Sequence, residues 1–257
     1  DGKPVSLTPS QLVFATGAYG AHKMADIPEK QAFAGEVIHT SQYRLGSDYA
    51  DKKCAVIGSA SSAHDVAADL WESGADVTMV QRSPSIVVRS ETLMKLGFEG
   101  LYSESAVENG LDVDKADMLA ASVPYRMIPE VQTPIYNQIA EVDSAFYRKL
   151  TAAGFLWDFG EDNSGLMAKA MRTASGYYID VGASALIADG RIKIKSDASI
   201  ESVVQNGLLM SDGTVIEADV IVHATGFKSL DDTVARLISY KVSECVGKFW
   251  GYGSGID

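Results

Sequence analysis

The segment GSASSA at positions 58–63 has the clearest chemical meaning in the sequence. It follows the apolar run Cys54–Ile57 and opens a segment with helical spacing. In a turn of this kind the chain bends sharply at the first glycine, and backbone N–H groups at the start of the helix face a pyrophosphate. Ala60 takes the place of the usual second glycine and narrows the approach to the phosphates. The alternative is an ordinary strand-to-helix turn, but the context favours a dinucleotide site formed by Gly58, Ser59, Ala60, Ser61 and Ser62.

A basic residue stands where a NAD-binding unit would carry an acidic one. Arg82 and Ser83 follow the apolar run Val77–Val80, about 20 positions after the turn. A carboxylate there would repel a ribose 2′-phosphate, whereas Arg82 can form charge-assisted hydrogen bonds with it. Such bonds contribute roughly 1.5–3 kcal/mol each, so Arg82, with Ser83 as a second donor, predicts at least a tenfold preference for NADPH over NADH. The alternative is that Arg82 only solvates the end of a strand.

A strand–helix–strand unit is needed to position both motifs. The runs Cys54–Ile57 and Val77–Val80 are short, apolar and typical of buried parallel strands. Between them, Ser61–Ser73 places its apolar residues on one face of a helix. We expect Ser61 or Ser62 to cap this helix and Gly74 to follow its end. The pattern predicts an α/β fold with a doubly wound, Rossmann-like NADPH-binding domain.

The rest of the chain departs from this alternation. Residues 86–178 are rich in proline, tyrosine, phenylalanine and methionine, and they predict an ordered helical insertion that includes a helix near Ile135–Leu150. An additional buried strand is expected at Gln11–Phe14. After Gly182 the pattern favours β-structure, with a turn at 211–213. The strands expected there are Ile192–Ile194, Ile200–Val204, Leu208–Met210 and Val220–Val222.

A third motif, F-x-G-x-x-x-H-x-x-x-Y, is formed by Phe33, Gly35, His39 and Tyr43 just before the first strand of this unit. It resembles the fingerprint of flavin-containing monooxygenases. In Baeyer–Villiger monooxygenases the corresponding run ends in Trp followed by Pro or Asp, so Tyr43-Arg44 favours the first group. The resemblance implies that His39 orders the linker and the cofactor and is not a catalytic base. Tyr43 belongs to the same implied cofactor-binding set.

The tripeptide Ala-Thr-Gly occurs twice, at positions 15–17 and 224–226. In flavoproteins that the chain resembles, such turns lie where the chain passes between the FAD and NADPH domains. The resemblance therefore implies cofactor contacts for Thr16, Gly17, Thr225 and Gly226. It also implies three parts: 1–46, the tail of a FAD domain and a linker; 47–218, the NADPH domain with its insertion at about 86–178; and 219–257, an incomplete return into the FAD domain.

The resemblance implies an enzyme that uses NADPH and FAD to oxygenate a soft nucleophile, an amine or a sulfide, through a C4a-hydroperoxyflavin. Its partners would be a small-molecule substrate and O₂. The Gly-rich FAD turn of the family is not found in the sequence, so we expect a truncated fragment whose own FAD binding is open. The sequence identifies no catalytic residue, and we expect no metal site. The alternatives are a Baeyer–Villiger monooxygenase and a non-catalytic NADPH-binding module. A flavin-dependent disulfide reductase is a weaker choice, because Cys54 and Cys245 form no redox pair in the sequence.

Composition narrows the partners further. The 257 residues carry a formal net charge of −12, which argues against nucleic acid and anionic membranes. No stretch approaches the ~20 apolar residues of a membrane span, and the first residues do not resemble a signal peptide. We therefore expect a cytoplasmic protein, with a homo-oligomer left open.

Overall fold

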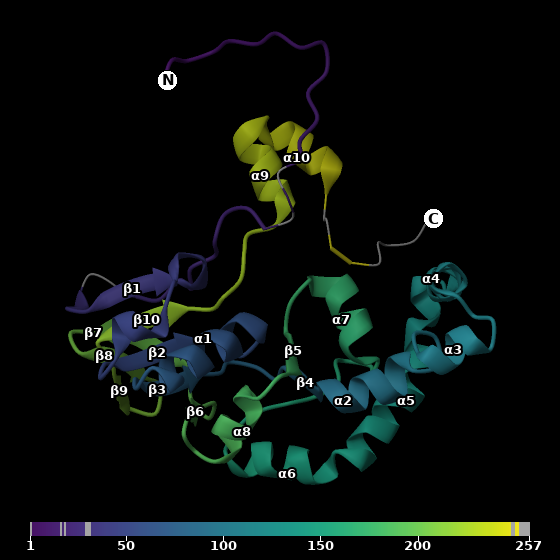
Figure 1. Ribbon diagram of the computed structural model, residues 1–257. Helices are drawn as coiled ribbons and strands as arrows, with labels where there is room; N and C mark the ends of the chain where they lie inside the picture. The colour runs from purple at the N-terminus through teal and green to yellow at the C-terminus, as the bar shows by residue number, and fades with distance from the viewer. Residues whose placement is uncertain (1, 16, 18, 29–31, 248–249, 252–257) are drawn as a thin grey trace. The chain divides into compact units, whose positions relative to one another are not determined.

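The structure is a computed structural model that describes residues 2–15, 17, 19–28, 32–247 and 250–251 (Figure 1). The chain divides into two compact units. The larger unit comprises Lys23–Gly226 and Trp250–Asp257, and the smaller unit comprises Asp1–His22 and Phe227–Phe249. Within the described residues, no helix has both the length and the apolar character needed to cross a membrane.

A five-stranded parallel sheet forms the centre of the larger unit. Its strand order is β1-β10-β2-β3-β6, and every neighbouring pair is parallel. The strands are β1 Glu36–His39, β10 Val220–His223, β2 Lys53–Ile57, β3 Asp76–Val80 and β6 Lys193–Lys195. Helix α1, Ser61–Glu72, joins β2 to β3. The predicted α/β fold and the strand–helix–strand unit are confirmed.

The sheet is covered on both faces because successive side chains of a strand point in opposite directions. Cys54 and Val56 of β2 pack in one core with the apolar face of α1, while Ala55 and Ile57 pack in another. The second core is closed by a three-stranded antiparallel sheet that supplies Leu208 and other apolar residues. The strands of that sheet are β7 Ile200–Val204, β8 Gly207–Met210 and β9 Val215–Glu217. Burial on both faces explains why β2 reads as a continuous apolar run.

The segment between β3 and β6 is helical, as expected, and has its own apolar core. It also contains a parallel strand pair that was not expected, β4 Ile86–Arg89 and β5 Tyr177–Asp180. The expected helix at Ile135–Leu150 is two helices, because Asp143 leaves the helical conformation between them with φ −95° and ψ 20°. The helices are α2 Ser90–Leu93, α3 Glu104–Glu108, α4 Val113–Ser122, α5 Ile128–Val142, α6 Ser144–Ala152, α7 Gly165–Thr173 and α8 Ala183–Ala188.

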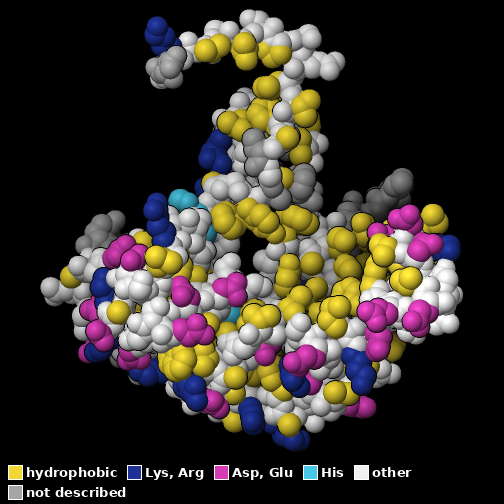
Figure 2. All heavy atoms as spheres, viewed as in Figure 1, with side chains coloured by type: hydrophobic (Ala, Val, Ile, Leu, Met, Phe, Trp, Pro, Cys, Tyr) yellow, Lys and Arg dark blue, Asp and Glu magenta, His cyan; other side chains and the backbone are white. Residues whose placement is uncertain are grey.

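Exposed apolar side chains gather over these insertion helices in Figure 2. Several are methionines, including Met94, Met118 and Met127, which are 52%, 73% and 46% exposed. Unbranched, polarizable methionine side chains are common at surfaces that adapt to different binding partners.

The smaller unit contains two helices, α9 Leu230–Leu237 and α10 Tyr240–Val246. The strand expected at Gln11–Phe14 is wrong: these residues have no regular structure, and Leu12, Val13 and Phe14 are 70%, 83% and 47% exposed. A strand needs a neighbour for its N–H and C=O groups, and an apolar run supplies none by itself.

Candidate dinucleotide-binding site

The turn after β2 lies at the carboxyl edge of the parallel sheet, between the ends of β10 and β3. Gly58 N–H donates to the carbonyl of Val80 at 3.0 Å, and Ala224 N–H donates to the carbonyl of Ile57 at 2.9 Å. Gly58 has a φ of +130°, and a Cβ added there would lie 2.4 Å from the carbonyl oxygen of Ala224. Only glycine meets both conditions, so the first position of the predicted motif is explained by the neighbouring strand end.

The helix after this turn begins without a side-chain cap. Ala60 is the N-cap residue and makes no side-chain hydrogen bond. The prediction that Ser61 or Ser62 caps the helix is wrong, because both lie inside the first turn; the Ser61 hydroxyl donates instead to the carbonyl of Tyr177 at 2.8 Å. The first N–H groups of a helix have no intrahelical acceptor and form its positive end. The start of α1 therefore fits an anion such as a pyrophosphate.

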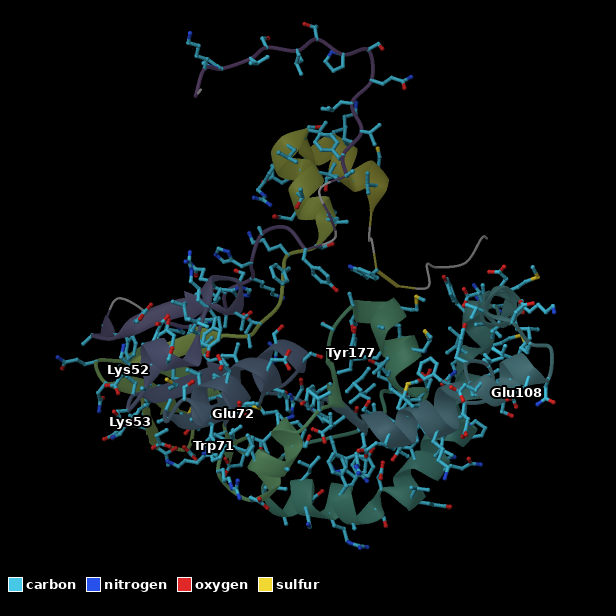
Figure 3. The ribbon with its side chains drawn as sticks, viewed as in Figure 1. Lys52, Lys53, Trp71, Glu72, Glu108 and Tyr177 are labelled. Atoms are coloured by element: carbon cyan, nitrogen blue, oxygen red, sulfur yellow. The ribbon has the colours of Figure 1, made fainter. Side chains whose placement is uncertain are left out.

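The five predicted turn residues differ in burial and in the partners of their side chains. Ser59 is buried, and its hydroxyl lies 2.8 Å from that of Ser85, so its side chain points into the protein. Ala60 and Ser61 are partly buried, and Ser62 is exposed at the start of α1. A nucleotide at this turn would thus meet backbone groups and the exposed Ser62. Figure 3 labels Tyr177, the Ser61 acceptor, near this end of α1, and Lys53 at the far end of β2.

Arg82 and Ser83 follow β3 at the same edge of the sheet, and both are exposed. In the described part of the chain, no carboxylate forms an ion pair with Arg82. An exposed guanidinium that is not neutralised by a carboxylate is suited to a phosphate. The residues around the turn thus fit a dinucleotide with a 2′-phosphate.

The fingerprint histidine connects two strand ends. His39 is fully buried, and its Nε2 donates to the carbonyl of Gly226 at 2.9 Å. Its Nδ1 accepts from the backbone N–H of Ser41 at 3.1 Å, which is consistent with a neutral ring protonated on Nε2. Gly226 also accepts from Lys23 N–H at 2.9 Å, and the Thr225 hydroxyl donates to the Lys23 carbonyl. The second Ala-Thr-Gly turn is therefore held by His39 and by the segment that starts at Lys23.

The other fingerprint residues also have structural partners. Tyr43 donates to the Asp69 carboxylate of α1 at 2.6 Å, and burial together with that carboxylate raises the pKa of Tyr43 well above its ordinary value. A Cβ at Gly35 would lie 2.2 Å from the carbonyl oxygen of Asp219 and against the ring of Phe33. Of the first Ala-Thr-Gly turn, Thr16 lies outside the described residues, and Gly17, with φ +81°, belongs to the smaller unit.

Two buried polar residues beside the site, Gln81 and His64, are not among the predicted site residues. Gln81 is fully buried at the end of β3, and its side-chain amide exchanges two hydrogen bonds with the backbone of Leu156, at 2.7 and 2.8 Å. His64 is fully buried in α1 and stacks on Tyr178 with ring centroids 4.0 Å apart. Burial lowers the pKa of His64 to about 4, so the ring is neutral at physiological pH. A polar residue next to an apolar run is the one hint that the sequence contains for Gln81.

A cavity of about 500 Å³ lies at the opposite edge of the sheet. Two of its lining residues mark strand starts: Lys53 is the first residue of β2, and Asp219 immediately precedes β10. The other lining residues are Ala34, Gly35, Gln205, Asn206, Glu217 and Ala218. Ligands of open parallel sheets bind outside the carboxyl ends of the strands, whereas this cavity lies at their amino ends. It is separate from the turn and from Arg82.

The chain is similar in sequence to known oxidoreductases. Residues 4–108 match the family model described as pyridine nucleotide-disulphide oxidoreductase. A probable indole-3-pyruvate monooxygenase, YUCCA10 of Arabidopsis thaliana, is 28% identical over 218 residues, which are 85% of this chain and 49% of the relative. Indole-3-pyruvate monooxygenase YUCCA1 of Oryza sativa subsp. japonica is 26% identical over 220 residues, 85% of this chain and 47% of the relative. The chain spans about half the length of the curated relatives that it matches.

Solved structures show the same fold. A cyclohexanone monooxygenase bound to epsilon-caprolactone matches with a TM-score of 0.58 and 18% identity, over 86% of this chain and 48% of that one. The OTEMO complex with FAD and NADP matches with a TM-score of 0.57 and 15% identity, over the same shares of the two chains. The neighbours therefore include proteins solved with both cofactors that the motifs imply. These matches confirm the resemblance predicted from the motifs: the chain is similar in sequence to flavin-dependent monooxygenases and shares their fold.

Proposed function

We propose that this chain is the NADPH-binding part of a flavin-dependent monooxygenase. The observation that carries the proposal is the exposed guanidinium of Arg82, without a carboxylate partner among the described residues, at the same sheet edge as the uncapped start of α1. An anion site and a cation beside it match the pyrophosphate and the 2′-phosphate of NADPH.

Each group at the site has a proposed task. Backbone N–H groups at the start of α1 hold the pyrophosphate, with Ser62 as an exposed side-chain donor. Arg82 and Ser83 hold the 2′-phosphate. Bound NADPH supplies a hydride, and FAD supplies the chemistry with O₂. His39, Tyr43, Thr225 and Gly226 order the chain between the cofactors, and we assign Thr16 and Gly17 to the FAD side by resemblance alone.

The substrate of the whole protein has two candidates. The motif Tyr43-Arg44 supports oxygenation of a soft nucleophile, an amine or a sulfide. The names of the relatives support a carbonyl compound instead, because indole-3-pyruvate and cyclohexanone both contain a ketone. Product analysis with a sulfide and a cyclic ketone, on the protein with a complete FAD domain, separates the two: a sulfoxide supports the first and a lactone the second. In either case the proposed partners are a small molecule and O₂.

Calorimetric titration with NADPH and NADH tests the cofactor proposal. We expect NADPH to bind at least about tenfold more tightly, and Arg82→Ala to remove that preference, because the two nucleotides differ only in the 2′-phosphate. Equal affinities in the wild-type chain, or a preference that survives Arg82→Ala, would refute the assignment. Cytoplasmic location, homo-oligomerisation and the division into FAD and NADPH domains stay predictions.

A further inference from the structure

The loop that carries Arg82 is short and attached at both ends. Arg82, Ser83 and Pro84 are exposed, whereas the residues on either side, Gln81 and Ser85, are 0% and 4% exposed. A flexible arginine side chain on a mobile loop would have to be ordered when the phosphate binds. A loop already held in place avoids much of that cost.

One backbone carbonyl of the insertion holds both ends of this loop. The carbonyl oxygen of Leu156 accepts from the side-chain N–H of Gln81 at 2.7 Å and from the backbone N–H of Ser85 at 3.3 Å. The Gln81 side chain also accepts from the N–H of Leu156 at 2.8 Å. Buried amides with donor and acceptor both satisfied are held in one orientation, because leaving either unpaired is unfavourable.

Further bonds tie the loop to the sheet and to the turn after β2. The backbone N–H of Gln81 donates to the carbonyl of Lys195 in β6 at 2.8 Å. The hydroxyls of Ser85 and Ser59 lie 2.8 Å apart, and both side chains are buried. Ser59 belongs to the turn proposed to hold the pyrophosphate. A direct side-chain contact thus links the two proposed phosphate-binding parts of the site.

We propose that Gln81 and Ser85 are positioning residues that determine the preference for NADPH, because they hold Arg82 where a 2′-phosphate would lie. This inference rests on the proposed function, in which Arg82 binds that phosphate. Neither residue touches the nucleotide in this scheme; both act through Arg82. The helical insertion, through Leu156, is then part of the cofactor specificity of the chain.

The test is calorimetric titration of NADPH and NADH with the 257-residue chain carrying Gln81→Met or Ser85→Ala. Methionine has nearly the shape of glutamine but can replace neither hydrogen bond to Leu156. We expect the affinity for NADPH to fall about tenfold, with that for NADH changing less than about threefold, since only the 2′-phosphate contact is lost. Tyr136→Phe is the matched control, because it removes another buried hydrogen bond of the insertion, which the N–H of Leu166 donates to the Tyr136 hydroxyl at 2.9 Å and which involves neither the loop nor Leu156.

A double variant shows whether the effect passes through Arg82. In the Arg82→Ala background, Gln81→Met should leave the NADPH-to-NADH ratio unchanged. An equal loss of both nucleotides in Gln81→Met and Ser85→Ala, or a ratio altered as much by Tyr136→Phe, would overturn the inference. If Gln81→Met does not fold, Ser85→Ala decides alone. A wild-type chain without NADPH preference, or a preference that survives Arg82→Ala, would instead overturn the proposed function and, with it, this inference.

Discussion

Replacing Gly58 by alanine should destabilise the larger unit and disturb nucleotide binding. Two features of this position oppose a side chain. The backbone φ of +130° is one that residues other than glycine rarely adopt, and the new Cβ would lie 2.4 Å from the carbonyl oxygen of Ala224. The atom in the way belongs to the backbone at the end of β10, so it cannot rotate aside as a flexible side chain would.

The magnitude follows from these two contributions. Forcing alanine into a sparsely populated backbone conformation costs about 1–3 kcal/mol. Overpacking against a rigid neighbour costs about another 1–3 kcal/mol. We therefore expect the free energy of unfolding to fall by about 2–6 kcal/mol, a large share of the roughly 5–15 kcal/mol that stabilises a typical domain. NADPH and NADH should lose affinity together, because the turn is proposed to hold the pyrophosphate that both contain.

Urea denaturation of the wild-type chain and of Gly58→Ala measures the effect. Gly213→Ala is the matched control, because Gly213 has a φ of +81° but no atom within 4 Å of an added Cβ. In this control the alanine must adopt an unfavourable backbone conformation but meets no neighbouring atom. Its free energy of unfolding should therefore fall by only about 1–3 kcal/mol. If the two variants differed by less than about 0.5 kcal/mol, the ordinary scatter of surface substitutions, the close approach of Ala224 would not be what requires glycine at the turn.

Three further variants test other parts of the site. Tyr43→Phe should lower the free energy of unfolding by about 0.5–1.5 kcal/mol in urea, because the hydroxyl bond to Asp69 is lost, while Tyr240→Phe, at a side chain 79% exposed, should change little. His39→Phe should cost about 1–3 kcal/mol, because the bond to the Gly226 carbonyl is lost and the Ser41 N–H loses its acceptor. The NADPH-to-NADH ratio should be unchanged in calorimetric titration, and an altered ratio would contradict a purely ordering role. Burial lowers the pKa of His64 to about 4 from 6.5. As the pH falls from about 6.5 to about 4, the unfolded state binds a proton at His64 and the folded state does not. The free energy of unfolding should therefore drop by up to about 1.4 kcal/mol per pH unit between these two values. Urea denaturation across this pH range should show that the free energy of unfolding falls less steeply in His64→Phe than in the wild-type chain. Identical slopes in the two proteins would refute the lowered pKa of His64.

Local sequence patterns were sufficient to predict an element when the residues of that element alone indicate its type. The strands β2 and β3 are buried on both faces, so their apolar runs were visible in the sequence, and the spacing of apolar residues marked α1. Gly74, with φ +94°, follows that helix as predicted. The motifs at Gly58 and Arg82 could be placed at one sheet edge because parallel strands present their carboxyl ends on the same side.

Predictions failed where a distant segment decides the outcome. Gln11–Phe14 is as apolar as a strand, but no described neighbour pairs with it. Ser61 was a reasonable cap by type, yet its hydroxyl is taken by Tyr177, 116 positions away in the sequence. The bonds between Gln81 and Leu156 span 75 positions and leave no local pattern. Side-chain hydrogen bonds of this kind depend on which backbone groups the fold brings near.

The sequence by itself determined which residues form the proposed nucleotide site, because residue type alone makes glycine fit the turn and arginine fit a phosphate. Only the tertiary structure decided how those groups are held. The strand order β1-β10-β2-β3-β6 brings His223, near the end of the larger unit, into register with Ile57, and so places Ala224 against Gly58. Such long-range pairing reflects the burial of whole sheet faces, which depends on the entire chain and not on any local run of residues.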